Sequence, residues 1–143
     1  MKDNIFRAWQ NGVMSNAFTF DDLSNGAITI GKDDVVAQFT GRLDNNGNRI
    51  FEGDIVKYVR KNVCLGAKTH DSVVFIGSIF WAYDKCQYQY SHKFKNGSVA
   101  NSSIDFNDDR AEVNIVEVVG NIYEHPTLLE VLQKNLFGCG EAL

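Results

Sequence analysis

Glycine-marked turns between short strand-like runs are the feature that most constrains the fold of this chain. The clearest is Asn11-Gly12, between Phe6–Gln10 and Val13-Met14. It predicts a type I′ hairpin, because both central residues of that turn need positive φ. A second turn, at Ser24-Asn25-Gly26, precedes the predicted strand Ala27–Ile30, and one helical turn is expected at residues 20–23. With 12 glycines and one proline in 143 residues, the chain is predicted to be mainly β with many tight turns.

The segment Gln38–Val56 holds the densest turn cluster between two apolar ends. Its polar residues at 44, 46 and 48 alternate as in a calcium loop. An EF-hand also needs glycine at the sixth position and glutamate at the twelfth, which is Ile55 here. We therefore predict a tight surface turn instead of a calcium site. Gly53-Asp54 then predicts a sharp corner that feeds a strand.

Three further strands are predicted in the second half of the chain. Ser72–Tyr83 is almost wholly apolar, β-branched or aromatic, with Gly77 as a predicted bulge or bend. Gln87–Phe94 alternates, so that Tyr88, Tyr90, His92 and Phe94 share one face. Val113–Val119 is the last strand. The polar stretches predicted to be loops between these strands are residues 61–71 and 95–112.

A C-terminal helix is predicted from Pro126 to Gly138, because proline suits the first helical position and glycine the C-terminal cap. Its leucines at 128, 132 and 136 form an apolar stripe. A helix this short is marginal alone in water, so the stripe must dock. Docking on its own sheet is the first interpretation, and docking on a second subunit is the alternative.

Composition excludes several classes of protein. The three cysteines, Cys64, Cys86 and Cys139, are an odd number in no metal-binding spacing, so neither a disulfide framework nor a zinc site nor any cofactor is expected. Apolar runs are too short to span a bilayer, and the start of the chain lacks the layout of a secretion signal, which together predict a soluble protein. The net charge is −4, yet residues 39–95 hold nine basic and five acidic groups.

Three blocks together resemble the YopX family of phage and prophage proteins: Phe6–Trp9, Gln38–Val56 and Val118–Pro126. Phe39 and Phe51 stand where tyrosine is expected, and His125 where asparagine is. The resemblance implies a mainly β (α+β) fold with a small SH3-like barrel and a viral or prophage origin, but no catalytic residues. Together with the missing export and membrane signals, it leads us to expect the protein in the host bacterial cytoplasm. We expect an N-terminal hairpin extension (1–37), the barrel (38–124) and the helix (125–143) in one compact unit. The motif residues, expected to be structural, are Arg7, Trp9, Phe39, Gly41, Asn46, Gly47, Gly53, Asp54, Gly120, Asn121, Tyr123 and Pro126.

Three functions remain open from the sequence. The first is a non-catalytic accessory module that binds a host or phage protein or assembles with itself, without a membrane. The second is nucleic-acid binding by the basic segment, against which the isoelectric point of about 5.3 argues. The third is an enzyme, for which the pairs Cys64/His70 and Asp33/Asp34 have no diagnostic spacing. The residues proposed to contact nucleic acid are Lys57, Arg60, Lys61, Lys68, Tyr88 and Tyr90.

Overall fold

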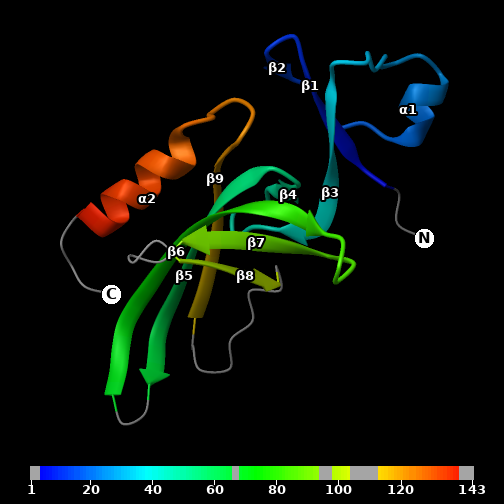
Figure 1. The fold of residues 1–143 in the computed structure, drawn as a ribbon. Helices are drawn as coiled ribbons and strands as arrows, with labels where there is room; N and C mark the ends of the chain where they lie inside the picture. Colours follow the sequence, from blue (N-terminus) through cyan, green and yellow to red (C-terminus); the bar gives the residue numbers. More distant parts are fainter. Residues whose placement is uncertain (1–3, 66–67, 94–97, 104–112, 139–143) are drawn as a thin grey trace.

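The computed structural model describes residues 4–65, 68–93, 98–103 and 113–138, which form two antiparallel sheets and two helices (Figure 1). The strand order is β2-β1-β3-β4 in the first sheet and β8-β7-β6-β5-β9 in the second. The chain is therefore mainly β, as predicted. The elements are β1 (Phe6–Gln10), β2 (Val13–Met14), α1 (Phe20–Ser24), β3 (Val35–Leu43), β4 (Arg49–Phe51), β5 (Asp54–Leu65), β6 (Lys68–Ala82), β7 (Gln87–Lys93), β8 (Val99–Ser103), β9 (Val113–Asn121) and α2 (Leu128–Gly138).

The N-terminal hairpin follows the turn chemistry of its sequence. Asn11 and Gly12 have φ values of 50° and 80°, as a type I′ turn requires, and they join β1 to β2. The expected helical turn is α1, closed by a reciprocal capping box between Thr19 and Asp22. The predicted strand Ala27–Ile30 is wrong, because no described strand pairs with this segment.

The second sheet extends beyond the apolar segments that predicted its strands. Residues 61–71 were expected to be a loop, but β5 and β6 continue their pairing to Leu65 and Lys68. Part of the predicted loop 95–112 is also a strand, because Val99–Ser103 forms β8 on β7. Both predictions fail for the same reason: a polar segment still forms backbone hydrogen bonds when a neighbouring strand pairs with it. Residues 95–97 and 104–112 lie outside the described residues.

Gly77 occupies a place where two strands come close together. It pairs with Val56 on one side and His92 on the other, so β6 passes through it without the predicted bulge. A Cβ atom at Gly77 would lie 2.1 Å from the backbone oxygen of Ser91. The irregularity of this sheet lies instead between Ile55 and Val56, on the β9 side.

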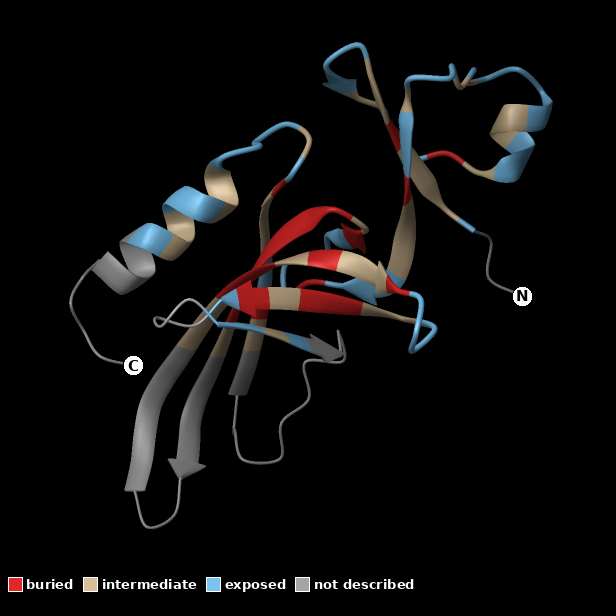
Figure 2. Ribbon diagram, in the orientation of Figure 1, coloured by how far each residue is buried: buried red, intermediate tan, exposed pale blue. Residues whose placement is uncertain are grey.

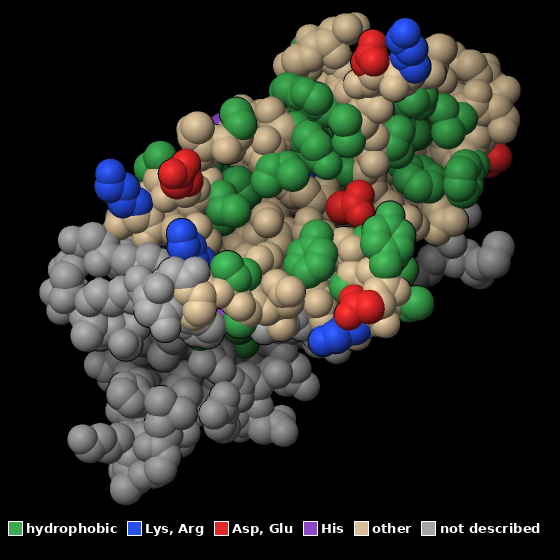
Figure 3. Space-filling view, in the orientation of Figure 1, with side chains coloured by type: hydrophobic (Ala, Val, Ile, Leu, Met, Phe, Trp, Pro, Cys, Tyr) green, Lys and Arg blue, Asp and Glu red, His purple; other side chains and the backbone are tan. Residues whose placement is uncertain are grey.

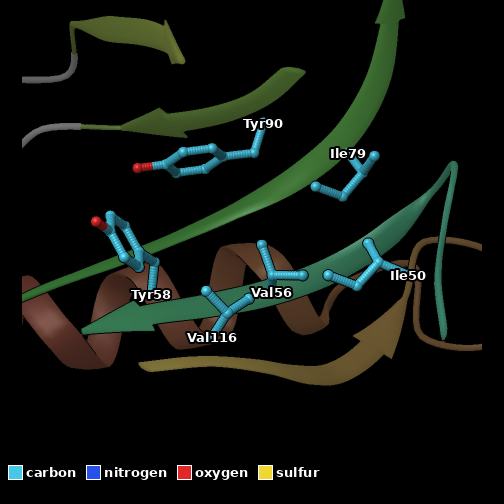
Figure 4. Close-up of a cluster of buried hydrophobic side chains, with 6 residues drawn as sticks. All are labelled: Ile50, Val56, Tyr58, Ile79, Tyr90 and Val116. Carbon is cyan, nitrogen blue, oxygen red and sulfur yellow. The ribbon is translucent and has the colours of Figure 1, made fainter. Parts of the chain in front are cut away.

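The core lies where the short strand β4 of the first sheet meets the second sheet. Buried residues gather along the start of β5, the second half of β6 and the middle of β7 (Figure 2). Because Ile50 comes from β4, one apolar cluster joins the two sheets. The side chains of this cluster point toward one another in Figure 4 and are Ile50, Val56, Tyr58, Ile79, Tyr90 and Val116.

The SH3-like barrel is not confirmed by these strand pairings. In the second sheet β8 and β9 are the two ends, and no described pairing joins them. The division into 1–37, 38–124 and 125–143 stays a prediction, although β3 runs from Val35 to Leu43 and so crosses the first boundary.

Helix α2 docks on its own sheet, as the first interpretation of its leucine stripe predicts, through Leu128 and Gln133; the side chain of Leu136 lies outside the described residues. The side-chain amide of Gln133 donates to the backbone oxygen of Ile76 in β6, at 3.2 Å. Leu128 packs so closely on Gly120 that a Cβ there would lie 2.6 Å from its Cδ2 atom. The helix begins at Leu128 rather than at Pro126, because a tight turn from the His125 carbonyl to the Leu128 amide comes first. None of the described helices is long and apolar enough to cross a membrane.

Candidate functional site

The first and second family blocks meet in a buried ion pair. Arg7 of β1 donates to the carboxylate of Asp54 at the start of β5, and Asp54 has no exposed surface. The other carboxylate oxygen accepts from the backbone N–H of Phe51, at 2.7 Å, and the Arg7 guanidinium lies 4.5 Å from the centre of the Phe51 ring. Burial raises the pKa of Asp54, and the charge of Arg7 and these hydrogen bonds offset that rise only in part. The pair is therefore a structural link between the two sheets.

The third block joins the first two through Tyr123. Its ring stacks on Trp9, with 6.4 Å between the ring centres. It also covers Gly53, where a Cβ would lie 2.6 Å from the ring and where φ is +87°. Glycine is therefore required twice over at this corner, by its backbone conformation and by the close approach of Tyr123. Asn121 turns the chain toward Tyr123, because its side-chain oxygen accepts the amides of residues 123 and 124.

The polar turn at 44–48 is fastened to the outer edge of β9. Asn45 exchanges two hydrogen bonds with the backbone of Val116, one through its own amide N–H and one through its side-chain oxygen. Asp44 accepts the amide of Val118 at 3.0 Å, and those of Asn46 and Asn48. The residues whose spacing resembles a calcium loop therefore bond to the edge of β9, where a neighbouring strand would otherwise pair.

Asp44→Asn is expected to lower the free energy of unfolding at pH 7 by about 2 kcal/mol, because one buried amide donor loses its acceptor. Burial alone raises the pKa of Asp44, but the hydrogen bonds from Val118, Asn48 and Asn46 outweigh it and hold the pKa below its ordinary 3.8. The stabilisation is present above that value and is lost as the pH falls below it. Urea unfolding of both proteins at pH 7 and pH 3 should show a smaller difference at pH 3. An unchanged difference would contradict this role, and Asp84→Asn is the exposed control.

A cleft opens between the two sheets on the face that Figure 3 shows, where hydrophobic side chains gather around an acidic one. We call it the aromatic cleft; its volume is about 300 Å³. Strands β1 and β3 contribute one wall, and the ends of β6 and β7 the other. It is lined by Phe6, Val36, Gln38, Glu52, Trp81, Tyr83 and Tyr88.

The aromatic cleft combines fixed rings with one carboxylate. Trp81 and Tyr88 meet edge to face, with 4.8 Å between the ring centres, and the Tyr88 hydroxyl donates to Gln38 at 3.2 Å. Burial and the nearby charge of Glu52 raise the pKa of Tyr88 to about 12, so the hydroxyl stays protonated. Burial raises the pKa of Glu52 as well. Within the described residues, no cationic side chain pairs with Glu52.

Comparison with known proteins identifies the family. The YopX protein family matches residues 7–130, which include every motif residue named in the sequence analysis. The chain belongs to the YopX family. Among solved structures, the YopX chain is similar to the crystal structure of protein EF1440 from Enterococcus faecalis. The identity is 18%, the TM-score is 0.41, and the match covers 88% of this chain and 97% of that chain. No curated protein matches it.

The remaining motif residues of this YopX protein lie in turns or at contacts between strands. Gly41 lies in the irregular part of β3 and Gly47 in the 44–48 turn. Both have positive φ values, of 90° and 82°. Asn46 is exposed and donates only its backbone amide to Asp44. Phe39 packs on Phe51, with 5.8 Å between ring centres. Pro126 is exposed, in the turn before α2.

The residues proposed to contact nucleic acid do not form one described surface. Lys57 is exposed on β5, but Tyr90 is 3% exposed and belongs to the core, where it cannot stack on a base. Tyr88 lies in the aromatic cleft. The side chains of Arg60, Lys61 and Lys68 lie outside the described residues.

The pairs considered for catalysis give no reaction centre among the described side chains. Asp33 is exposed, while Asp34 accepts hydrogen bonds from Gln10 and from the backbone of Gly31, which lower its pKa. The side chains of Cys64 and His70 lie outside the described residues. Sequence reasoning missed the aromatic cleft, because its lining comes from four segments that no spacing rule connects. Only Glu52, directly after the apolar pair Ile50-Phe51, could have drawn notice.

Proposed function

We propose that this YopX protein is a non-catalytic accessory protein of a phage or prophage that binds another protein in the host cytoplasm. The observation that carries the proposal is the aromatic surface around the cleft. Tyr83 is 85% exposed and Phe20 is 56% exposed, and Phe20 packs on the cleft residue Phe6, with 4.9 Å between ring centres. Adjoining exposed apolar side chains around a cleft are typical of a protein-binding site.

The motif side chains support this proposal because they pair and pack with one another. Arg7 and Asp54 neutralise each other, and Trp9, Tyr123 and Gly53 pack together. They shape a scaffold, which we propose to be SH3-like, and leave recognition to the surface around it. The charge of the cleft favours protein over nucleic acid as the partner, because its one ionisable carboxylate, Glu52, would repel phosphate.

Tyr83→Ala is expected to remove partner binding without unfolding the protein. A side chain this exposed contributes little to the fold, so the change in unfolding free energy should stay within about 0.5 kcal/mol. Affinity capture from host cells, followed by cross-linking of the retained complex, should show a partner that the wild type holds and Tyr83→Ala loses. Val99→Ala, which removes apolar surface on β8 away from the cleft, is the matched control. Equal capture by Tyr83→Ala and the wild type would refute the proposal.

A further inference from the structure

A backbone hydrogen bond fixes the place of Glu52 at the aromatic cleft. Glu52 lies in the corner between β4 and β5, and its amide donates to the backbone oxygen of Gln38 in β3, at 3.0 Å. Gln38 is itself engaged by the Tyr88 hydroxyl. The corner therefore fixes the backbone of Glu52, whose side chain lines the cleft between the two walls.

The surroundings of Glu52, which has no cationic partner among the described side chains, favour a cation as its ligand. A partly buried carboxylate loses hydration, and a positive group that donates a hydrogen bond compensates for that loss most strongly. The rings of Phe6, Trp81 and Tyr88 offer π surface on which a lysine ammonium or an arginine guanidinium also binds. An apolar side chain would leave the charge desolvated, and a phosphate or carboxylate would be repelled.

We propose that the aromatic cleft binds a lysine or arginine side chain of the partner protein, an inference that rests on the proposed function. The volume of about 300 Å³ lies at the lower end of ligand pockets, so it suits one long side chain better than a larger molecule. The aliphatic stem of that residue would lie along the aromatic walls, with its charged end at Glu52. Exposed Tyr83 and Val36 at the rim would contact the neighbouring residues of the partner.

Four synthetic nonapeptides that differ only at the central residue test this proposal. They carry lysine, arginine, norleucine or glutamate between apolar neighbours, and norleucine keeps the lysine stem without its charge. Binding is followed by fluorescence of labelled peptides and by NMR shifts of the Trp81 indole. We expect the lysine and arginine peptides to bind at least tenfold more tightly than the norleucine peptide. The glutamate peptide should be the weakest.

Two charge variants separate the cleft from long-range attraction. Glu52→Gln should reduce the affinity for the lysine peptide to that for the norleucine peptide, while Asp84→Asn, which removes a carboxylate from the neighbouring turn, should leave it unchanged. Equal losses in both variants, or no preference for lysine over norleucine, would overturn the proposal. A dimer in solution that Glu52→Gln dissociates would overturn it in favour of a second copy as occupant. If the peptides fail while capture still depends on Tyr83, the cationic inference fails and the proposed function stands.

Discussion

Arg7→Leu is expected to lower the free energy of unfolding by about 3–5 kcal/mol, because it leaves a fully buried carboxylate without its cation. A typical domain of this size has a total stability of about 5–15 kcal/mol, so much of it would be lost. The variant also removes the guanidinium from the face of the Phe51 ring. Urea unfolding at pH 7, followed by circular dichroism, measures the loss.

The double variant Arg7→Leu, Asp54→Asn is the control for charge. Its neutral amide still accepts from the Phe51 N–H, so we expect it to be more stable than Arg7→Leu alone. In the single variant the pKa of Asp54 rises further, since Arg7 no longer lowers it. The folded state then binds a proton that the unfolded state releases, so the deficit should shrink as the pH falls from 7 toward 5. A double variant no more stable than the single one would show that lost packing, not charge, dominates.

Gly77→Ala is expected to lower the unfolding free energy by about 3 kcal/mol or to prevent folding, because the added methyl would overlap backbone that cannot move aside cheaply. The methyl carbon would lie 2.1 Å from the backbone oxygen and 2.8 Å from the carbonyl carbon of Ser91. Relieving the overlap requires separating β6 from β7 at the middle of the second sheet. Thermal unfolding by calorimetry tests the expectation.

Gly31→Ala is the matched control for that variant. An added methyl at Gly31 would meet only the side chain of Asp34, at 3.4 Å, and its φ is not in the left-handed region. It should therefore change stability little, or raise it by about 0.4–1 kcal/mol through the smaller entropy of the unfolded chain. If Gly77→Ala were as stable as Gly31→Ala, the close approach of β7 would not be what selects glycine at position 77.

Local rules predicted the parts of the fold that depend on local chemistry. The hairpin at Asn11-Gly12 and the corner at Gly53 follow from the backbone preferences of single residues or dipeptides. Strand extent was not predictable in this way. Residues 61–65 are a strand because β6 pairs with them, and residues 99–103 because β7 pairs with them. The pattern of apolar residues within each segment gives no sign of this pairing.

The same distinction explains why the sites differed in how well they could be foreseen. The resemblance to the YopX family directed attention to Arg7, Asp54 and Tyr123, but no spacing indicated that they meet. The aromatic cleft depends on Phe6, Glu52 and Trp81 arriving from separate elements of two sheets. Alternation in Gln87–Phe94 correctly placed Tyr90 and His92 on one face. It could not tell that this face is covered, because the covering residues come from other strands.

The turn at 44–48 has a consequence for how copies of this protein could join. Side-chain and backbone groups of Asp44 and Asn45 already bond to backbone donors and acceptors of β9. A strand of another molecule therefore cannot pair with this edge at those residues. The opposite margin belongs to β8. Two molecules joined there by a two-fold axis would each present a closed β9 outward. Strand addition at β9 would thus be blocked at Val116 and Val118, where the polar turn already holds the outward backbone groups.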